Sequence, residues 1–204
     1  GFGKVYRTTD QGSTWSVMGT SFSSSRILSI RVKGSKVFAA TQGEGIYVTS
    51  DGTSWTAVNT GLGTDLTITD LLVKGNDIFA ADYTASGGGG FFVSGDDGAH
   101  WTNRAGGTTS SDLMKACFID SSEIVVAGRE GVILRSHNGG RNWIPLSSGV
   151  TSALNAVYFS DANTGIVAGA QGIILRTTDG GITWTAVPSG TTNDLFCLSF
   201  INAG

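Results

Sequence analysis

The 204-residue sequence contains little proline, little cysteine and few charged residues. Charged side chains make up 14% of the chain, against about 25% in an average soluble protein. Two Pro beside 31 Gly, with no Gly-X-Y period, exclude a collagen. Two cysteines, Cys117 and Cys197, are too few for a disulfide scaffold. Both lie in apolar runs, so we expect two buried free thiols, although a disulfide between them stays open.

Long hydrophobic runs and an excess of positive charge are also missing. No apolar run approaches the ~20 residues needed to cross a bilayer. The net charge of −3 argues against a nucleic-acid-binding protein, which usually presents a basic face. Hydrophobic residues still make up 40% of the chain, which is enough for a folded core. The abundance of Gly suits many short strands joined by tight turns.

Five tryptophans recur at nearly constant spacing, with gaps of 40, 46, 42 and 41 residues. Each ends a phrase of the form Ser/Thr-x-Asp-x-Gly-x-x-Trp, except that the second phrase is one residue shorter and the fourth has Asn138 in place of Asp. We call these phrases the tryptophan turns; they cover residues 8–15, 49–55, 94–101, 136–143 and 177–184. Their defining residues are Asp10, Gly12 and Trp15; Asp51 and Trp55; Asp96, Gly98 and Trp101; Asn138, Gly140 and Trp143; and Asp179, Gly181 and Trp184.

Each tryptophan turn belongs to a longer repeat of short apolar runs. In the last repeat these runs are 154–159, 165–168, 173–176 and 184–187, separated by Gly/Asn/Asp turn sequences. They are rich in Val, Ile, Phe and Tyr and too short for helices. Four strands in a repeat of about 42 residues are typical of a propeller blade. The sequence therefore predicts an all-β fold, a β-propeller of four-stranded antiparallel blades.

The composition of the tryptophan turn has a physical explanation. We expect it to join the third and fourth strands of a blade, with Asp and Ser/Thr side chains accepting hydrogen bonds from backbone N–H groups. Gly supplies a backbone with positive φ. The Trp begins the outer strand and buries its ring beside the turn or against the next blade. Asn138 keeps an oxygen acceptor, so the fourth turn should survive, whereas the short second turn should need another geometry.

The tryptophan turns resemble the Asp-box, or BNR, repeat. That family includes sialidases, sortilin-type receptors, xyloglucan hydrolases and the photosystem II stability/assembly-factor-like propellers. Residues 131–149 and 172–190 are most similar to the last group. The resemblance implies a propeller that binds another protein and helps to assemble or organise it. The box is a structural element across these families, so it does not indicate one activity.

The repeats at both ends of the chain are incomplete. Residues 1–25 supply only two final strands and residues 195–204 only a first strand, which together make three strands. This favours a fragment of a larger ring, because an incomplete ring exposes strand edges and apolar blade faces. A closed five-blade ring and a terminal blade completed by a neighbouring chain stay open. The complete repeats within this single domain, residues 1–204, are about 26–65, 66–111, 112–153 and 154–194.

Candidate binding residues lie in the loops between the second and third strands and between blades, the face on which propellers usually bind ligands. The strand 2–3 loops are 41–45, 82–90, 128–131 and 169–172. Glu44, Glu130 and Gln171 hold equivalent positions, and Arg129 is the best anion-pairing candidate. The alternative is that these are ordinary solvated loop residues, and that the SGGGG run at 86–90 is a flexible tip. The predicted partner-binding residues are Glu44, Tyr83, Arg104, Arg129, Glu130 and Gln171, with Gln42 and Asp82 nearby.

The sequence contains little that supports a catalytic, cofactor or metal site. Arg7, Arg135 and Arg176 hold the same position in three repeats, which indicates a structural role and not a converged triad gripping a carboxylate. His100 and His137 lie in turns of different blades and should not converge on a metal. The SGDDG sequence at 94–98 lacks the spacing of a calcium loop. We therefore expect no catalytic residue, no cofactor and no metal.

Together these features predict a non-catalytic protein-binding or scaffold module without a membrane span and without nucleic-acid binding. Few Lys and many Ser, Thr and Gly residues suggest an extracytoplasmic bacterial protein. Two alternatives remain. One is a glycan-active hydrolase or lectin of the Asp-box type. The other is a structural subunit of an extracellular filament or surface layer, which would self-associate through its incomplete terminal blades.

Overall fold

The computed structural model describes residues 3–19, 25–83 and 89–200, and the elements in them are β-strands apart from two short 3-10 turns. The all-β prediction is therefore confirmed. The chain divides into two compact units, the first built from 1–85 and 92–103 and the second from 86–91 and 104–204. Within the described ranges, no helix is long and apolar enough to span a membrane.

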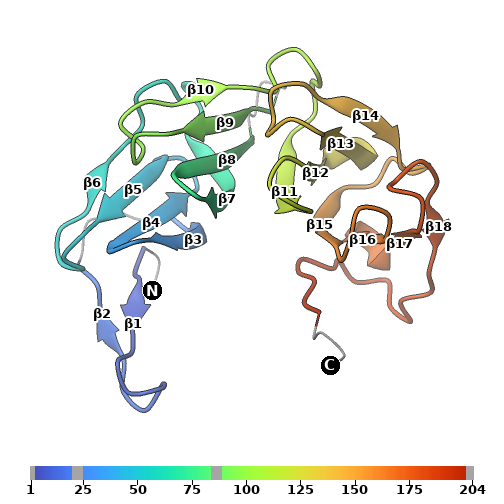
Figure 1. Cartoon of the computed structure of the whole chain (residues 1–204). Helices are drawn as coiled ribbons and strands as arrows, with labels where there is room; N and C mark the ends of the chain where they lie inside the picture. The colour runs from blue at the N-terminus through green and yellow to red at the C-terminus, as the bar shows by residue number, and fades with distance from the viewer. Residues whose placement is uncertain (1–2, 20–24, 84–88, 201–204) are drawn as a thin grey trace. The chain divides into compact units, whose positions relative to one another are not determined.

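The first unit contains two four-stranded antiparallel sheets and one two-stranded sheet (Figure 1). In each sheet, strands that follow one another in the chain also lie side by side. The strands are β1 (Tyr6–Arg7) and β2 (Ser16–Val17); β3 (Ile27–Lys33), β4 (Lys36–Thr41), β5 (Ile46–Thr49) and β6 (Thr56–Ala57); and β7 (Thr67–Lys74), β8 (Asp77–Tyr83), β9 (Phe91–Ser94) and β10 (Thr102–Asn103).

The second unit contains two more sheets of the same kind. Its 3-10 turns, η1 (Arg129–Gly131) and η2 (Ala170–Gly172), each connect the second strand of a sheet to the third. Four-stranded antiparallel blades are thus confirmed in both units. The strands are β11 (Leu113–Phe118), β12 (Ile124–Gly128), β13 (Val132–Ser136) and β14 (Ile144–Ser147), followed by β15 (Leu154–Phe159), β16 (Gly165–Gly169), β17 (Ile174–Thr177) and β18 (Thr185–Ala186).

The repeats share their register as well as their strand order. The first strand of every four-stranded sheet carries a register shift at the same place, between Ile27 and Ser29, Ile68 and Asp70, Leu113 and Lys115, and Leu154 and Ala156. A bulge of this kind bends a strand and increases its twist. The equivalent bulges allow residues of different repeats to be matched one to one.

Apolar cores form where consecutive sheets of one unit stack. In the first unit Phe38 and Ile46 of one sheet pack with Ile68 and Leu71 of the next. In the second unit the core includes Val125 and Ile133 from one sheet and Leu154, Phe159 and Val167 from the other. Burial of such side chains contributes about 25 cal/mol per Å² of apolar surface. Each sheet is therefore stabilised mainly by its neighbour.

Two expectations about the last segment are wrong. Residues 195–200 form no strand, although the Leu195 N–H donates to the Gly169 carbonyl at 3.0 Å, because no adjacent strand pairs with them in the described residues. Cys197, in the same segment, is exposed and not buried. Cys117 is half-buried beside the second core, and neither cysteine forms a disulfide.

Two glycines with nearly the same φ differ in their surroundings and so provide a test of the close backbone contact at Gly172. Gly172 has φ +73° and Gly190 has φ +75°, but a Cβ at Gly172 would lie 2.0 Å from the Thr191 carbonyl oxygen, whereas nothing lies within 4 Å of one at Gly190. Gly190→Ala should cost about 1–2 kcal/mol for the left-handed backbone. Gly172→Ala should cost about 1–3 kcal/mol more for overpacking. Urea unfolding followed by circular dichroism measures both; equal losses would contradict the close approach.

Candidate functional site

The tryptophan turns are held by a carboxylate that accepts several hydrogen bonds. In the fifth turn, Asp179 Oδ1 accepts from the Thr177 hydroxyl at 2.8 Å and from the Thr183 N–H at 2.9 Å, while Oδ2 accepts from the Thr183 hydroxyl at 2.6 Å. Gly181, at φ +89°, donates its N–H to Thr177 Oγ1 at 2.8 Å. The turn joins β17 to β18, so the predicted link between third and fourth strands is confirmed.

The predictions for the two atypical turns are also confirmed. In the fourth turn, Asn138 Oδ1 accepts hydrogen bonds from the Ser136 hydroxyl and from the Asn142 N–H, at 3.1 and 2.8 Å. In the short second turn, Asp51 Oδ1 accepts from the N–H groups two and three residues later, not four. That turn has one positive-φ residue, Gly52, where the others have two in succession.

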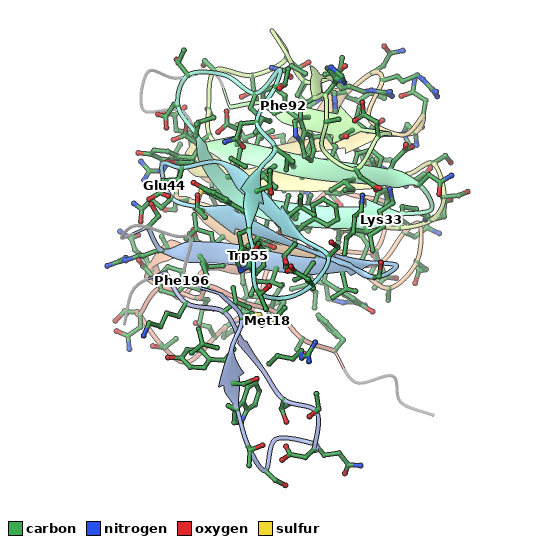
Figure 2. The ribbon with its side chains drawn as sticks, turned by 90° about the vertical axis from the view of Figure 1, so that its left-hand side faces the viewer. Met18, Lys33, Glu44, Trp55, Phe92 and Phe196 are labelled. Atoms are coloured by element: carbon green, nitrogen blue, oxygen red, sulfur yellow. The ribbon has the colours of Figure 1, made fainter. Side chains whose placement is uncertain are left out.

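Of the two positions expected for the indole ring, the structure shows the one beside its own turn, together with a contact to the preceding repeat that was not expected. A Cβ at Gly98 would lie 3.6 Å from the Trp101 ring. Trp55 and Trp101 are buried against the preceding repeat, not the next, and their N–H groups donate to the carbonyls of Met18 and Val58, both at 2.7 Å. Figure 2 shows Trp55 close to Met18. Trp15, in the first repeat, is 61% exposed. Burial of the ring thus depends on a preceding repeat, which the turn sequence alone does not contain.

Hydrogen bonding within the turns acidifies their aspartates. The Thr183 hydroxyl and N–H, followed by the Thr177 hydroxyl, lower the pKa of Asp179 from its usual 3.8 to about 2. Equivalent bonds, led by those from Thr14 and His100, lower the pKa of Asp10 and Asp96 to about 2. These carboxylates therefore act as hydrogen-bond acceptors within the turns. With such low pKa values they are poorly suited to act as general acids near neutral pH.

This acidification predicts how the fifth turn responds to pH. The folded pKa of Asp179 lies below the unfolded value, so its stabilising contribution is complete above pH 3.8 and is lost as the pH falls through about 2. Carbon-13 NMR should show the Asp179 carboxyl titrating near 2. The control is the Asn142 amide resonance, which should not follow an acidic titration because Asn138 cannot ionise there. A midpoint for Asp179 near 3.8 would contradict the hydrogen-bonded turn.

The strand 2–3 turns of the second unit place two of the predicted residues identically. Glu130 has φ 55° and ψ 26°, and Gln171 has φ 58° and ψ 28°, so both sit in the left-handed region at the same point of their turns. The Ser111 hydroxyl donates to Glu130 Oε2 at 2.7 Å. Asp194 Oδ1 accepts from the Gln171 N–H at 2.9 Å. Glu130 and Gln171 therefore have equivalent backbones but different polar partners. Glu44, predicted as their equivalent, differs, because the left-handed residues of its turn are Gly43 and Gly45.

Arg129 and Glu130 line one pocket of about 390 Å³ in the second unit. The Arg129 side chain is 53% exposed, and its Nε lies 3.6 Å from Asp112 Oδ2. Phe196, which also lines the pocket, is 71% exposed. The pocket combines apolar surface with charges of both signs. Its lining residues are Met114, Arg129, Glu130, Ala153, Asn155, Ala170, Asp194 and Phe196.

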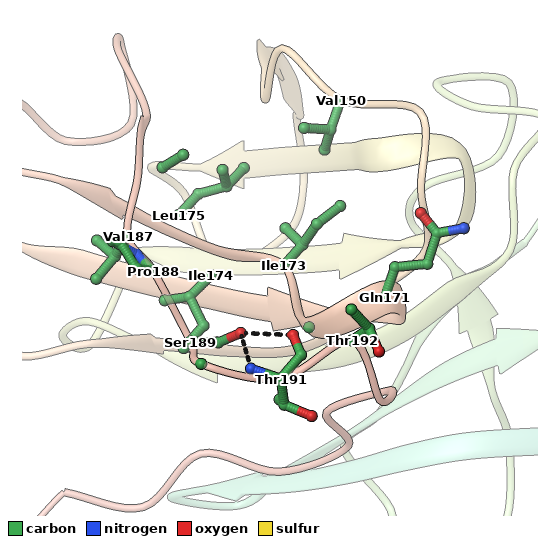
Figure 3. Close-up of a pocket in the computed structure, with 13 residues that line it drawn as sticks. Val150, Gln171, Ile173, Ile174, Leu175, Val187, Pro188, Ser189, Thr191 and Thr192 are labelled. Carbon is green, nitrogen blue, oxygen red and sulfur yellow. Dashed lines mark hydrogen bonds between the residues drawn. The ribbon is translucent and has the colours of Figure 1, made fainter.

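A larger pocket of about 710 Å³ lies on the last sheet, where β18 ends (Figure 3). Gln171 lies at one end of it, and Ile174, Val187 and Pro188 lie toward the other. Gln171 thus lines this pocket and not the Arg129 pocket, although its position in the repeat matches that of Glu130. Most of the residues that line this pocket are apolar.

The remaining predicted residues do not join the Arg129 pocket. Glu44 lies in the first unit, where it accepts hydrogen bonds from the hydroxyls of Ser25 and Tyr47 at 2.5 and 3.1 Å. Tyr83 ends β8 in the first unit, and residues 84–88 of its predicted loop lie outside the described residues. Arg104 follows β10 directly, and its N–H bonds the Phe91 carbonyl at 2.7 Å, so it continues the outer strand.

The sequence did not lead us to predict two clusters of polar side chains. Asp70 is buried in the first unit and accepts from the Ser29 hydroxyl at 3.1 Å and from the Arg31 guanidinium at 3.3 Å. An acid within the apolar run TITDLLV was the signal available. In the second unit, Arg135 pairs with Glu123 and donates to the Gly180 carbonyl of the next sheet at 2.6 Å. That contact supports a structural role for the repeated arginine position.

Comparison with known proteins agrees with this architecture. The structure is similar to YCF48 from Cyanidioschyzon merolae, with a TM-score of 0.72 and 20% identity over 97% of this chain and 71% of that one. It is also similar to the GH74 xyloglucanase from Xanthomonas campestris (TM-score 0.70, 14% identity, 93% and 34% covered) and to the Niastella koreensis GH74 enzyme (0.63, 21%, 91% and 28%). The chain thus spans about a third of these GH74 enzymes. At these identities the likeness shows the fold alone.

Sequence comparison identifies the family. No curated protein sequence matches the chain. The family model described as the DUF6242 beta propeller domain matches residues 2–118, more than half of the chain. The repeated four-stranded sheets described above are what such a domain requires. The chain therefore belongs to the DUF6242 beta propeller domain family.

Proposed function

We propose that the chain is a protein-binding module and that the Arg129 pocket holds a segment of another protein. The observation that supports this most directly is the lining of that pocket. Met114 and Phe196 provide apolar surface beside the Arg129 guanidinium and the Glu130 carboxylate. An apolar contact surrounded by a few fixed charged groups is typical of sites that recognise peptides and small ligands.

The charges in the pocket suggest what the segment contains. Arg129 has five N–H donors in a planar fork, and more than half of its side chain is exposed beside Asp112, so it suits an acidic side chain of the partner. Glu130 and Asp194 lie in the same pocket and suit a basic side chain or N–H donors. The exposed ring of Phe196 suits an apolar or cationic group. On this proposal, the partner presents an apolar residue flanked by charges of both signs.

The tryptophan turns are, on the same proposal, Asp boxes with a purely structural role. Their carboxylates are fully engaged in local hydrogen bonds, and their pKa values lie well below the range of a catalytic acid. They join the third and fourth strands, at the opposite end of the sheet from the strand 2–3 turns that line the pocket. The resemblance to assembly-factor-like propellers supports a binding or scaffolding role of this kind.

Selection from a phage-displayed library of random linear peptides tests the proposal. Peptides that bind the chain should bind the Arg129→Ala and Glu130→Ala variants about 5–30-fold more weakly in calorimetry, the range expected for residues that anchor an interface. Arg176→Ala, an exposed arginine on β17 outside the pocket, is the matched control and should leave affinity unchanged. Selected peptides that bind both pocket variants normally would contradict the assignment of the site.

The hydrolase alternative is tested separately. The chain is incubated with xyloglucan, β-glucan and sialosides, and release of reducing sugar or sialic acid is measured. We expect no turnover above a heat-denatured sample. Measurable turnover would contradict the non-catalytic proposal whatever the outcome of the peptide experiment.

A further inference from the structure

Two successive repeats of the second unit differ at a pair of equivalent positions beside the Arg129 pocket. In the third repeat the pair is Asp112 and Arg129, and in the fourth repeat it is Ala153 and Ala170. In each pair the first residue precedes the first strand of its sheet, and the second residue begins the 3-10 turn. Two side chains of opposite charge in one repeat are thus replaced by two methyl groups in the next.

The backbone around the two pairs is the same. Arg129 donates its N–H to the Asp112 carbonyl at 2.9 Å, and Ala170 donates its N–H to the Ala153 carbonyl at 2.9 Å. The glycine before the 3-10 turn approaches this carbonyl equally closely in both repeats, because a Cβ built there would lie 2.1 Å from the Asp112 oxygen or 2.0 Å from the Ala153 oxygen. The difference between the repeats is therefore confined to side chains.

The small side chains of the fourth repeat leave space in the pocket. Ala153 and Ala170 both line the cavity of about 390 Å³, together with Arg129. Arg129 itself shows that an arginine side chain is accommodated at this place of a repeat, with its Nε 3.6 Å from Asp112 Oδ2. The two alanines therefore determine how much of the pocket is open to a ligand.

The charges around the two alanines favour a cation. Glu130 and Asp194 also line the cavity, and the hydrogen bonds that they accept come from neutral groups, a serine hydroxyl and a backbone N–H. The charge of Arg129 is balanced by the carboxylate of Asp112 beside it. The pocket therefore carries an excess of negative charge next to two small side chains, which is complementary to a positively charged group.

We propose that the space beside Ala153 and Ala170 receives an arginine side chain of the bound protein segment. The guanidinium takes the place that Arg129 holds in the preceding repeat, and Glu130 and Asp194 accept its hydrogen bonds. Arginine suits the space better than lysine because it offers five N–H donors to the two carboxylates, against three. Ala153 and Ala170 are then the residues that determine specificity. This inference rests on the function proposed for the Arg129 pocket and adds the identity of one partner residue.

A pair of small probes tests the space directly. N-acetyl-arginine methylamide and N-acetyl-citrulline methylamide have nearly the same shape, but only the arginine probe is charged. When the arginine probe is titrated into the chain labelled with carbon-13 in its alanine methyl groups, the NMR signals of Ala153 and Ala170 should shift. The citrulline probe should bind at least about 5-fold more weakly, because its hydrogen bonds to the carboxylates lack the positive charge. Equal affinity for both probes, or no shift with either, would overturn the proposal.

The variant Ala170→Arg fills the space from within the chain. It places the arginine of the third repeat on the same backbone, so the arginine probe should no longer shift the Ala153 signal. Arginine should be enriched among peptides selected on the wild-type chain, and those peptides should bind Ala170→Arg about 10–30-fold more weakly. Ile182→Arg is the matched control, since Ile182 is 75% exposed and does not line the pocket, and it should leave both measurements unchanged.

The outcomes separate this inference from the function on which it rests. Selected peptides that lose affinity for Arg129→Ala, but share no arginine or bind Ala170→Arg normally, would overturn the arginine assignment and leave the pocket as a peptide site. Peptides that bind both Arg129→Ala and Glu130→Ala normally would contradict the site itself. Circular dichroism shows whether the variants keep their strands, and the probe titration on the wild-type chain decides the matter where a variant does not fold.

Discussion

The structure depends on one constraint: a four-stranded sheet of this repeat cannot bury both of its apolar faces by itself. In the first unit, Trp55 and Trp101 meet this constraint by packing against the preceding repeat. Trp55 and Trp101 combine a buried indole with a hydrogen bond to a backbone carbonyl, which fixes position as well as contributing burial. Because the acceptor is a carbonyl, the side chain beneath the ring can vary between Met18 and Val58 without changing the contact.

The two ends of each sheet differ in role: the tryptophan turns at one end stabilise the fold, and the strand 2–3 turns at the other end are available for recognition. The tryptophan turns repeat nearly the same hydrogen bonds, and even Asn138 preserves the acceptor that its backbone needs. In the second unit the strand 2–3 turns keep their backbone, as Glu130 and Gln171 show, but differ in their side chains and in the polar groups that hold them. Variation at that end costs little stability because no core residue changes. Recognition can therefore differ from repeat to repeat on one scaffold.

Whether a feature can be predicted from the sequence depends on whether its interactions are local in the chain or join different repeats. The strands and the turn hydrogen bonds are local, so the spacing of the tryptophans and the phrase around Asp179 were sufficient to predict them. The position of the indole ring beside its own turn is local and was predicted, whereas its contact with the preceding repeat joins two repeats and was not. The same reason explains why Cys197 is exposed: its sequence surroundings are apolar, but no strand pairs with them in the described residues. It also explains why Arg104 was placed in a loop, since its position on the outer strand follows from the pairing of β9 with β10.

The likeness to both YCF48 and GH74 enzymes shows that this scaffold does not determine a chemistry, and the argument about function must therefore rest on particular side chains. Here the acids with the clearest roles are already engaged: Asp179 in its turn, Asp70 with Ser29 and Arg31, and Glu123 with Arg135. Groups held in this way are structural acceptors. Arg129 and Glu130 also have partners, Asp112 and Ser111, but they line a pocket beside exposed apolar surface, where a partner can replace water without breaking the hydrogen bonds of a tryptophan turn.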